Sequence, residues 1–159
     1  MDTGNELLRE WRAGDFLIST DRRRVDRDTV HGFLSTESYW AQGVARETVE
    51  RAIDGSPLVF GVYHAPTGAQ VGMARVITDF ATFSYLCDVF ILPAHRGQGL
   101  SKWLMSVIWS MPELQGQRRW MLATADAHGL YSQFGFEPLV QPERWMWRKG
   151  TRIEQYEDR

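Results

Sequence analysis

A glycine-containing segment between an apolar run and an amphipathic run is the part of this sequence best suited to hold a ligand. Small residues stand at Gly97, Gly99 and Ser101, and glycine lets the backbone approach a ligand closely and adopt unusual dihedral angles. An expected helix follows, and the first N–H groups of a helix have no partners within it. These donors could bind a phosphate or pyrophosphate, although a tight turn without a ligand explains the same residues.

The residue pattern of this segment excludes two common phosphate-binding loops. The dinucleotide fingerprint needs a third glycine where this chain has Lys102, and it follows the first strand of a parallel unit. The mononucleotide loop needs four residues between its glycines, followed by Lys-Ser or Lys-Thr. Neither pattern fits.

The segment resembles a known family. Residues 96–101 (RGQGLS), preceded by a strand and Pro93, resemble the acetyl-CoA pyrophosphate loop Q/R-x-x-G-x-G/A of the GNAT superfamily of N-acetyltransferases, with Ser101 at the last small position. Residues 130–136 (LYSQFGF) are similar to the family's late helix ending in Y-x-x-x-G-F. The order of expected elements is similar over residues 15–148, nearly the whole chain.

The resemblance implies acetyl-CoA as co-substrate, bound where the sheet splays between the strand ending at Leu92 and a strand at residues 120–124. The pantetheine arm would bond to the backbone of the first strand, and the pyrophosphate would sit on the N–H groups of the glycine loop. The residues implied in cofactor binding are Val89, Phe90, Ile91, Arg96, Gly97, Gln98, Gly99, Leu100, Ser101 and Lys102. We expect no metal, because no cysteine or histidine stands at ligand spacing.

The implied chemistry is direct attack of a primary amine on the thioester in a ternary complex. An alkyl amine has a pKa of about 10 and must lose a proton before it attacks at neutral pH. The leaving thiolate, with a reference pKa of about 8.5, benefits from a nearby acid. Backbone N–H groups near Phe90 would stabilise the charge that develops on the carbonyl oxygen.

Two side chains are candidates for the proton transfers. Tyr131 matches the position that serves as general acid in many members of the family, and packing of its helix onto the sheet is the alternative. Asp88 is the candidate base, because it lies on an otherwise nearly apolar strand two residues before Phe90, and burial makes a carboxylate a stronger base. A water relay and a structural hydrogen bond to the backbone are its alternatives. His128 could assist Tyr131, but a solvent-facing position is favoured.

The resemblance also implies that the acceptor enters over the first two helices and the strand turns. The substrate-binding candidates there are Glu37, Tyr39, Trp40 and Asp79. Aromatic faces beside a carboxylate suit a cationic amine through cation–π and charge interactions. Core packing is the alternative for most rings of this region, and Tyr39 and Trp40 are the expected exceptions.

The preferred function is therefore an acetyl-CoA-dependent N-acetyltransferase, a transferase acting on a small-molecule or peptide amine. A non-catalytic acyl-CoA-binding or sensing module with the same fold is one alternative, and an interaction protein that uses exposed tryptophans is another. The sequence leaves open whether the chain forms a homodimer. The acceptor itself, the acyl-chain preference and the route of the amine proton are left undetermined by the sequence.

The elements that must position these residues follow from hydrophobic periodicity. Strands are expected at residues 15–20, 58–63, 70–78, 83–92 and 120–124, with extended structure at 136–147. Helices are expected at 7–11, from Asp26 or Asp28 onward, at 46–53, from Gln98 to Met111 and at 126–134. The strands at 58–92 should form an antiparallel meander. The fold class is α/β (mixed α+β), and the resemblance implies a splayed, largely antiparallel sheet flanked by helices.

Composition sets the outer limits. The 159 residues are 43% hydrophobic and 24% charged, which fits one domain over residues 1–159 with a core at 15–148, a short N-terminal helix and a polar C-terminal tail. A net charge of −2 gives no electrostatic case for nucleic acid or a membrane surface. The sequence has no apolar run long enough to span a membrane, and residues 1–14 lack the apolar core of a signal peptide, so a cytoplasmic protein is expected.

Two further residue types carry expectations. The single cysteine, Cys87, permits no intramolecular disulfide and reads as a core thiol. The seven tryptophans are unusual for this length, and we expect most of them in the core. Trp40, Trp145 and Trp147 are the tryptophans that could contact the substrate, and the last two are expected on one face of a last strand.

Overall fold

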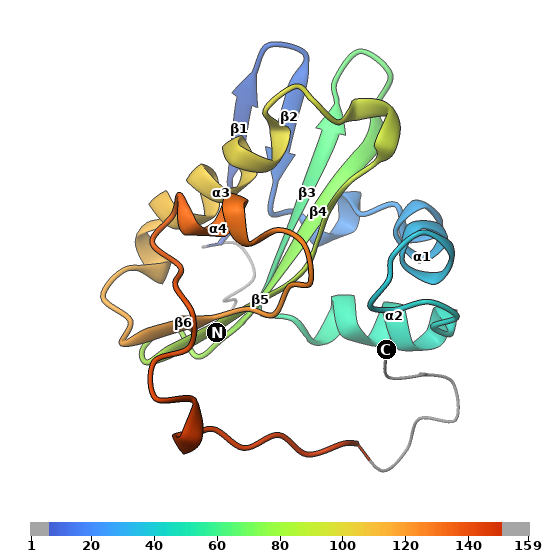
Figure 1. Ribbon diagram of the computed structural model, residues 1–159. Coiled ribbons are helices and arrows are strands. Elements are labelled where there is room, and N and C mark those ends of the chain that lie inside the picture. The colour runs from blue at the N-terminus through green and yellow to red at the C-terminus, as the bar shows by residue number, and fades with distance from the viewer. Residues whose placement is uncertain (1–6, 151–159) are drawn as a thin grey trace, which may run out of the picture.

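Six strands form one sheet in which every strand pairs with its neighbour in the sequence, in the order β1-β2-β3-β4-β5-β6 (Figure 1). The computed structural model describes residues 7–150. All pairs are antiparallel except β5 with β6, which are parallel. The strands are β1 (Glu10–Ala13), β2 (Phe16–Ser19), β3 (Leu58–His64), β4 (Ala69–Thr78), β5 (Phe83–Ile91) and β6 (Arg119–Met121).

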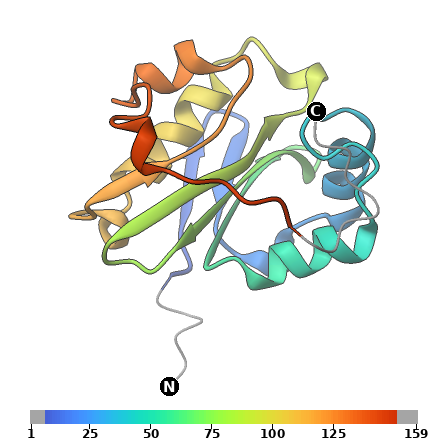
Figure 2. The same cartoon turned by 60° about the horizontal axis from the view of Figure 1, so that its bottom comes forward.

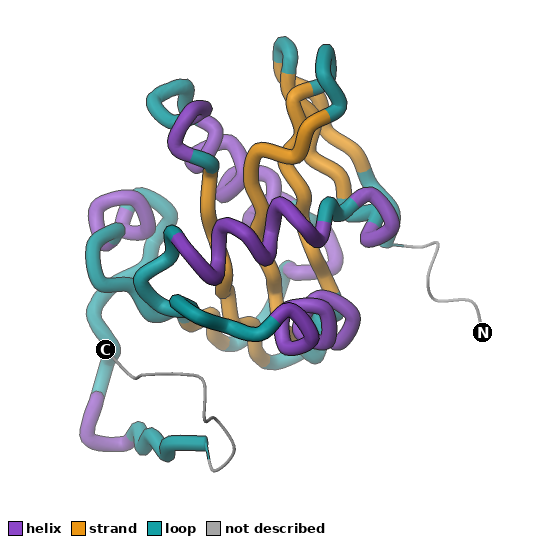
Figure 3. Tube along the Cα trace, turned by 90° about the vertical axis from the view of Figure 1, so that its right-hand side faces the viewer, coloured by secondary structure: helices purple, strands orange, loops and turns teal. Residues whose placement is uncertain are grey.

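Helices cover both faces of the sheet (Figures 2 and 3). The helices are α1 (Arg27–Thr36), α2 (Arg46–Gly55), α3 (Leu100–Ser110) and α4 (His128–Ser132). Helices α1 and α2 lie on one side, and α3 and α4 on the other. The predicted mixed α/β class with a largely antiparallel sheet is confirmed, and the meander at residues 58–92 is β3, β4 and β5.

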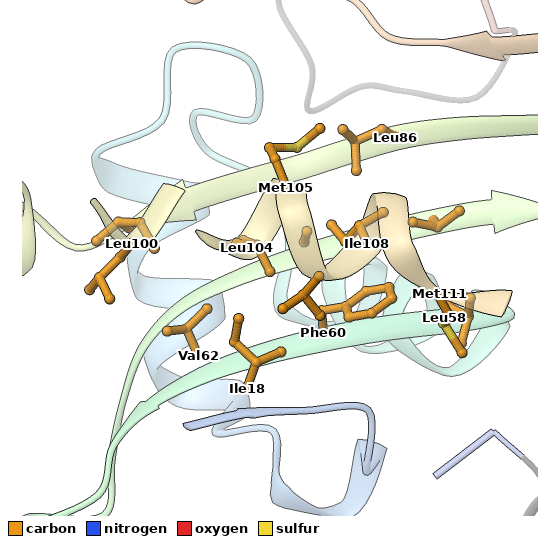
Figure 4. Close-up of a cluster of buried hydrophobic side chains, with 14 of the residues drawn as sticks. Ile18, Leu58, Phe60, Val62, Leu86, Leu100, Leu104, Met105, Ile108 and Met111 are labelled. Carbon is orange, nitrogen blue, oxygen red and sulfur yellow. The ribbon is translucent and has the colours of Figure 1, made fainter. Parts of the chain in front are cut away.

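The two helical layers bury two apolar clusters, one on each face. On one face Leu104 and Ile108 of α3 pack with Phe60 and Val62 of β3 in a group that we call the α3 cluster (Figure 4). On the other, residues of α1 and α2 pack with Val59 of the same strand. Because successive side chains of a strand point to opposite faces, β3 can be apolar throughout and supply both clusters.

Local signals start the two helices that flank the site. The side chain of Asp26 accepts hydrogen bonds from the N–H groups of Asp28 and Thr29 and so caps α1, as the sequence indicates. Helix α3 begins after Gly99 and has no side-chain cap. Its first N–H groups therefore face outward from the end of the helix.

The structure corrects two expectations about the ends of the chain. The helix predicted at residues 7–11 is wrong, because Glu10–Ala13 forms strand β1 against β2. The extended structure predicted at residues 136–147 forms no strand in the described chain and contains a 3₁₀ turn at Pro142–Arg144. Pro138 and Pro142 lack the N–H groups that a strand needs, so Trp145 and Trp147 share no strand face.

The expectation that most tryptophans lie in the core is also wrong. All seven fall within residues 7–150, and each keeps part of its ring accessible. Trp109 and Trp120 pack on each other at a centroid distance of 5.4 Å at the edge of the α3 cluster. Trp147 is 77% exposed. The fully buried positions belong to aliphatic side chains, methionines and Phe60, because an indole is large and carries an N–H group that needs a partner.

Within residues 7–150, no helix is long and apolar enough to cross a membrane.

Candidate active site

Strands β5 and β6 pair only where they begin. The paired residues are Phe83 with Arg119, Ser84 with Trp120 and Tyr85 with Met121. Strand β5 continues to Ile91, whereas β6 ends at Met121. From Leu86 onward, that edge of β5 is therefore not bonded to β6, and the sheet opens at this point.

A β-bulge bends β5 inside the opening. Strand β4 advances two residues, from Met73 to Arg75, while β5 spans three from Phe90 back to Cys87. The extra residue gives Asp88 a φ of 50°, in the left-handed region that is uncommon for residues other than glycine, although aspartate adopts it more readily than most. Bulges re-aim side chains and leave residues outside the ladder, so this one turns Asp88 away from the regular alternation of β5.

A cavity of about 390 Å³ lies at the opening. Its walls come from the α1–α2 connection, from β5 and from the segment that follows β6. The residues that line it are Tyr39, Trp40, Tyr85, Leu86, Cys87, Asp88, Val89, Leu122, Ala123, Thr124, Ala125, Asp126, Ala127 and Tyr131. The structure thus brings five of the sequence-derived candidates to one cavity: Tyr39, Trp40, Asp88, Val89 and Tyr131.

Tyr131 lies on α4 with its side chain largely buried, and its ring packs edge-on against Phe136 at a centroid distance of 6.0 Å. Burial raises the pKa of the Tyr131 phenol to about 12, with smaller contributions in the same direction from Tyr39 and Asp126. The phenol therefore stays protonated at neutral pH and can donate a hydrogen bond into the cavity.

Asp88 is held at both carboxylate oxygens. Nε of Arg75 donates to its Oδ2 at 2.7 Å, and the indole N–H of Trp40 donates to its Oδ1 at 3.0 Å. The side chains of Asp88 and Arg75 are each 13% exposed. A carboxylate fixed in this way keeps a defined position at the cavity wall, and the guanidinium of Arg75 balances its charge.

The glycine loop leaves space where an anion can approach. Gly97 and Gly99 have φ values of 79° and 77°, and a Cβ added at either would meet no atom within 4 Å. Nε of Arg96 donates to the carbonyl of Ile91 at 2.9 Å and fastens the loop to the end of β5. A helix N-terminus, outward N–H groups and an open surface fit a pyrophosphate, and the free edge of β5 fits a pantetheine arm.

The acceptor candidates fall into two groups. Tyr39 and Trp40 line the cavity, and the Tyr39 hydroxyl accepts a hydrogen bond from the N–H of Ala125 at 2.8 Å. Glu37 is exposed at the end of α1 and does not line the cavity. Asp79 lies in the β4–β5 turn, where its carboxylate accepts hydrogen bonds from turn N–H groups and the Thr82 hydroxyl, which hold its pKa well below the usual range.

Cys87 and Thr124 also line the cavity, but neither is assigned a part in the chemistry. The thiol of Cys87 has a pKa raised to about 11, chiefly by burial, so it is not a thiolate nucleophile at neutral pH. Thr124 Oγ1 accepts a hydrogen bond from the N–H of Ala127 at 3.0 Å ahead of α4. His128 is exposed and does not line the cavity. Residues 7–150 contain no group of three or more His, Cys, Asp or Glu side chains placed to hold a metal ion.

Sequence reasoning missed Arg75 and the segment after β6. Arg75 interrupts an apolar run in β4, and that interruption was its only signal. Its pairing with Asp88 depends on the β-bulge in β5, and no local sequence pattern predicts that bulge. Residues 122–127 were expected to be partly strand and partly helix, and their role as a cavity wall follows only from where β6 and α4 end.

Comparison with known proteins agrees with this architecture. The chain matches the family model "Acetyltransferase (GNAT) domain" over residues 55–138. A Gibberella zeae protein named "Putative acetyltransferase" is 34% identical in an alignment 143 positions long that covers 77% of this chain and 79% of that protein. A solved structure from Xanthomonas campestris pv. campestris, described as belonging to the GNAT family, is 47% identical, covers 87% of this chain and 96% of its own, and superposes with a TM-score of 0.82.

A more distant structure, from Clostridium acetobutylicum and solved with acetyl-CoA, is 12% identical, covers 84% of this chain and 94% of its own, and has a TM-score of 0.59. It shares the fold. Together the fold, the opened sheet and these matches define an acyltransferase class. The chain belongs to the GNAT family of acetyltransferases, whose members act on amine acceptors and typically use acetyl-CoA.

Proposed function

We propose that this protein transfers an acetyl group from acetyl-CoA to a primary amine of a small molecule or peptide, by direct attack in a ternary complex. The observation that carries this proposal is the cavity at the opening of β5 and β6, into which a buried, protonated tyrosine and a fixed carboxylate both face. Acyl transfer to an amine needs a proton donor for the leaving sulfur and an acceptor for the amine proton.

The chain's own residues supply the binding site for the co-substrate. The backbone of residues 89–91 would bind the pantetheine arm along the edge of β5 that β6 leaves free. The N–H groups of residues 97–102 would bind the pyrophosphate at the start of α3, with Arg96 and Lys102 beside it. When bound, acetyl-CoA supplies an acetyl group activated as a thioester.

The proton transfers are assigned to Tyr131 and Asp88. The neutral amine forms a C–N bond as the C–S bond breaks, and the electron pair of that bond leaves on sulfur. Tyr131 donates its phenolic proton to the sulfur, and Asp88 accepts the proton that the amine nitrogen loses, directly or through one water. The two protons balance over the cycle, because Asp88 releases the amine proton to solvent and Tyr131 regains one from solvent.

A panel of amines incubated with acetyl-CoA and followed by thiol release tests the proposal. We expect release with at least one amine class and, with coenzyme A alone, an increase in the melting temperature. The background is one thiol per chain, from Cys87. Stabilisation by coenzyme A without thiol release from any amine would favour a sensing module, and neither effect would favour an interaction protein.

Asp88→Asn tests the assignment of the base. It keeps the shape of the side chain and removes the charge that faces Arg75. If Asp88 takes the amine proton, the acidic limb of the pH–rate profile should shift or disappear in this variant. An acidic limb identical to that of the unmodified enzyme would assign the proton to a water relay.

A further inference from the structure

Two neighbouring cavities share two lining residues, Trp40 and Asp88. The indole of Trp40 lines the large cavity of about 390 Å³, and it also lines a second cavity of about 100 Å³ between α1, α2 and β4. Asp88 is the other residue common to both. Trp40 therefore stands between the space beside Tyr131 and a smaller space behind it.

Trp40 is fixed from several sides. Its N–H group donates to Asp88, its ring packs edge-on against Tyr39 at a centroid distance of 5.0 Å, and it contacts Phe33 at 6.2 Å. Asp88 is in turn held by Arg75, whose Nη1 donates to the Ser56 hydroxyl at 2.8 Å at the end of α2. A chain of polar contacts thus ties the indole to β4, β5 and α2.

The smaller cavity has a definite chemical character. Its walls are mostly aliphatic, from Leu34, Val44, Val49 and Ala52, and its charged wall is the Arg75–Asp88 ion pair. An uncharged, apolar substituent suits such walls, whereas a second ammonium group would have to lie beside Arg75. The volume has room for roughly three groups the size of a water molecule.

We infer that Trp40 determines which acceptors the enzyme takes, by closing the smaller cavity to the substituent that an amine carries. This inference rests on the proposed transfer to an amine in the large cavity. With Trp40 in place, the acceptor is confined to the large cavity. With a smaller side chain there, an apolar chain on the acceptor can extend into the space between α1 and α2.

The test is a chain-length series of linear primary amines, from propylamine to octylamine, with the unmodified enzyme, Trp40→Ala and Trp40→Phe. The ratio of kcat/KM for octylamine to that for propylamine should rise in Trp40→Ala by about tenfold or more, because each additional buried methylene favours binding by roughly fourfold. Trp40→Phe retains a ring and should shift the ratio in the same direction by less, which preserves the test if Trp40→Ala fails to fold.

Trp147→Ala is the matched control, because Trp147 is 77% exposed and lines neither cavity. Its length profile should equal that of the unmodified enzyme. A length profile in folded Trp40→Ala or Trp40→Phe that matches the control would overturn the inference.

Calorimetry of the same amines with coenzyme A present separates this inference from the proposed function. If neither the unmodified enzyme nor any variant releases thiol, the proposed function fails. A dissociation constant for octylamine that falls only in the Trp40 variants would still support the inference that Trp40 closes the smaller cavity. Equal chain-length dependence of binding in all variants would overturn it regardless of turnover.

Discussion

Tyr131 is the residue whose chemistry can be separated most cleanly from its packing. Tyr131→Phe removes one hydroxyl and keeps the ring that packs against Phe136. If the phenol protonates the leaving sulfur, kcat should fall by about 100-fold or more, while the KM for acetyl-CoA stays within about twofold. Steady-state kinetics at saturating amine measure both quantities.

Tyr63→Phe is the matched control for that substitution. Tyr63 is also buried, its pKa is raised by burial, and its hydroxyl has no hydrogen-bond partner, but it lies on β3 and does not line the cavity. Its removal should leave kcat unchanged. Equal kcat values for Tyr131→Phe and Tyr63→Phe would show that the Tyr131 side chain serves only to pack α4 onto the sheet.

The pKa of Tyr131 also predicts the alkaline side of the pH profile. Because burial raises this pKa to about 12, the protonated phenol is retained as pH rises and is lost only near that value. The profile of kcat/KM, which reports the free enzyme, should therefore show no descending limb below about pH 11, whereas an unperturbed tyrosine would give one near pH 10. A descending limb at or below about pH 10 that vanishes in Tyr131→Phe would contradict the buried, neutral state.

At the scale of elements, the turn from β5 into α3 depends on backbone conformation more than on side chains. Gly99→Ala places a Cβ on a residue with a φ of 77°, which costs roughly 1–2 kcal/mol in the left-handed region. If the loop relaxes to relieve that strain, its N–H groups change orientation. They must then return to their original orientation when coenzyme A binds, which costs binding free energy. The dissociation constant for coenzyme A, measured by calorimetry, should then rise by about tenfold.

Gly116→Ala serves as the control for strain without binding. Gly116 has a φ of 75° and equally open surroundings, but it lies in the connection from α3 to β6. It should lose similar stability and keep the affinity for coenzyme A. Comparable loss of affinity in both variants would mean that the glycine loop has no special part in binding.

The elements that the sequence predicts correctly are those with signals inside their own span. Helix α1 has a capping aspartate at Asp26 and apolar residues at helical spacing, and strands β3 to β5 are apolar runs separated by turn residues. Strand β1 has neither signal. Glu10–Ala13 becomes a strand because β2 offers it an edge, so its conformation is decided by a partner rather than by its own residues.

The residues of the site likewise differ in whether local sequence predicts them. The glycine loop and Tyr131 belong to short motifs that can be read in one stretch of chain. The cavity wall cannot be read in that way, because Tyr39, Asp88 and Asp126 come from three separate segments. The Arg75–Asp88 pair depends on a bulge, and the bulge depends on how β4 and β5 align over their whole length. The register between distant strands therefore determines the cavity wall and the Arg75–Asp88 pair, which local sequence patterns do not predict.

At the scale of the whole molecule, the sheet must stay intact for the opening between β5 and β6 to persist. The α3 cluster supports one entire face of the sheet, and Leu104 lies fully buried at its centre without lining the cavity. Leu104→Ala should lower the free energy of unfolding by about 2–5 kcal/mol, from lost burial and the void left behind. Urea denaturation measures the change.

Met146→Ala gives the comparison, because Met146 is 97% exposed and its loss should change stability by less than about 0.5 kcal/mol. Since β3 supplies side chains to both clusters, weakening one face should also loosen the other, and Leu104→Ala should still unfold in a single transition. Coenzyme A should raise the melting temperature of the folded variant as it does for the unmodified protein, because the loop and the free edge of β5 are unchanged. Two separate transitions would show instead that the α1–α2 layer folds independently of α3, and that the cavity wall at Tyr39 and Trp40 does not depend on the α3 cluster.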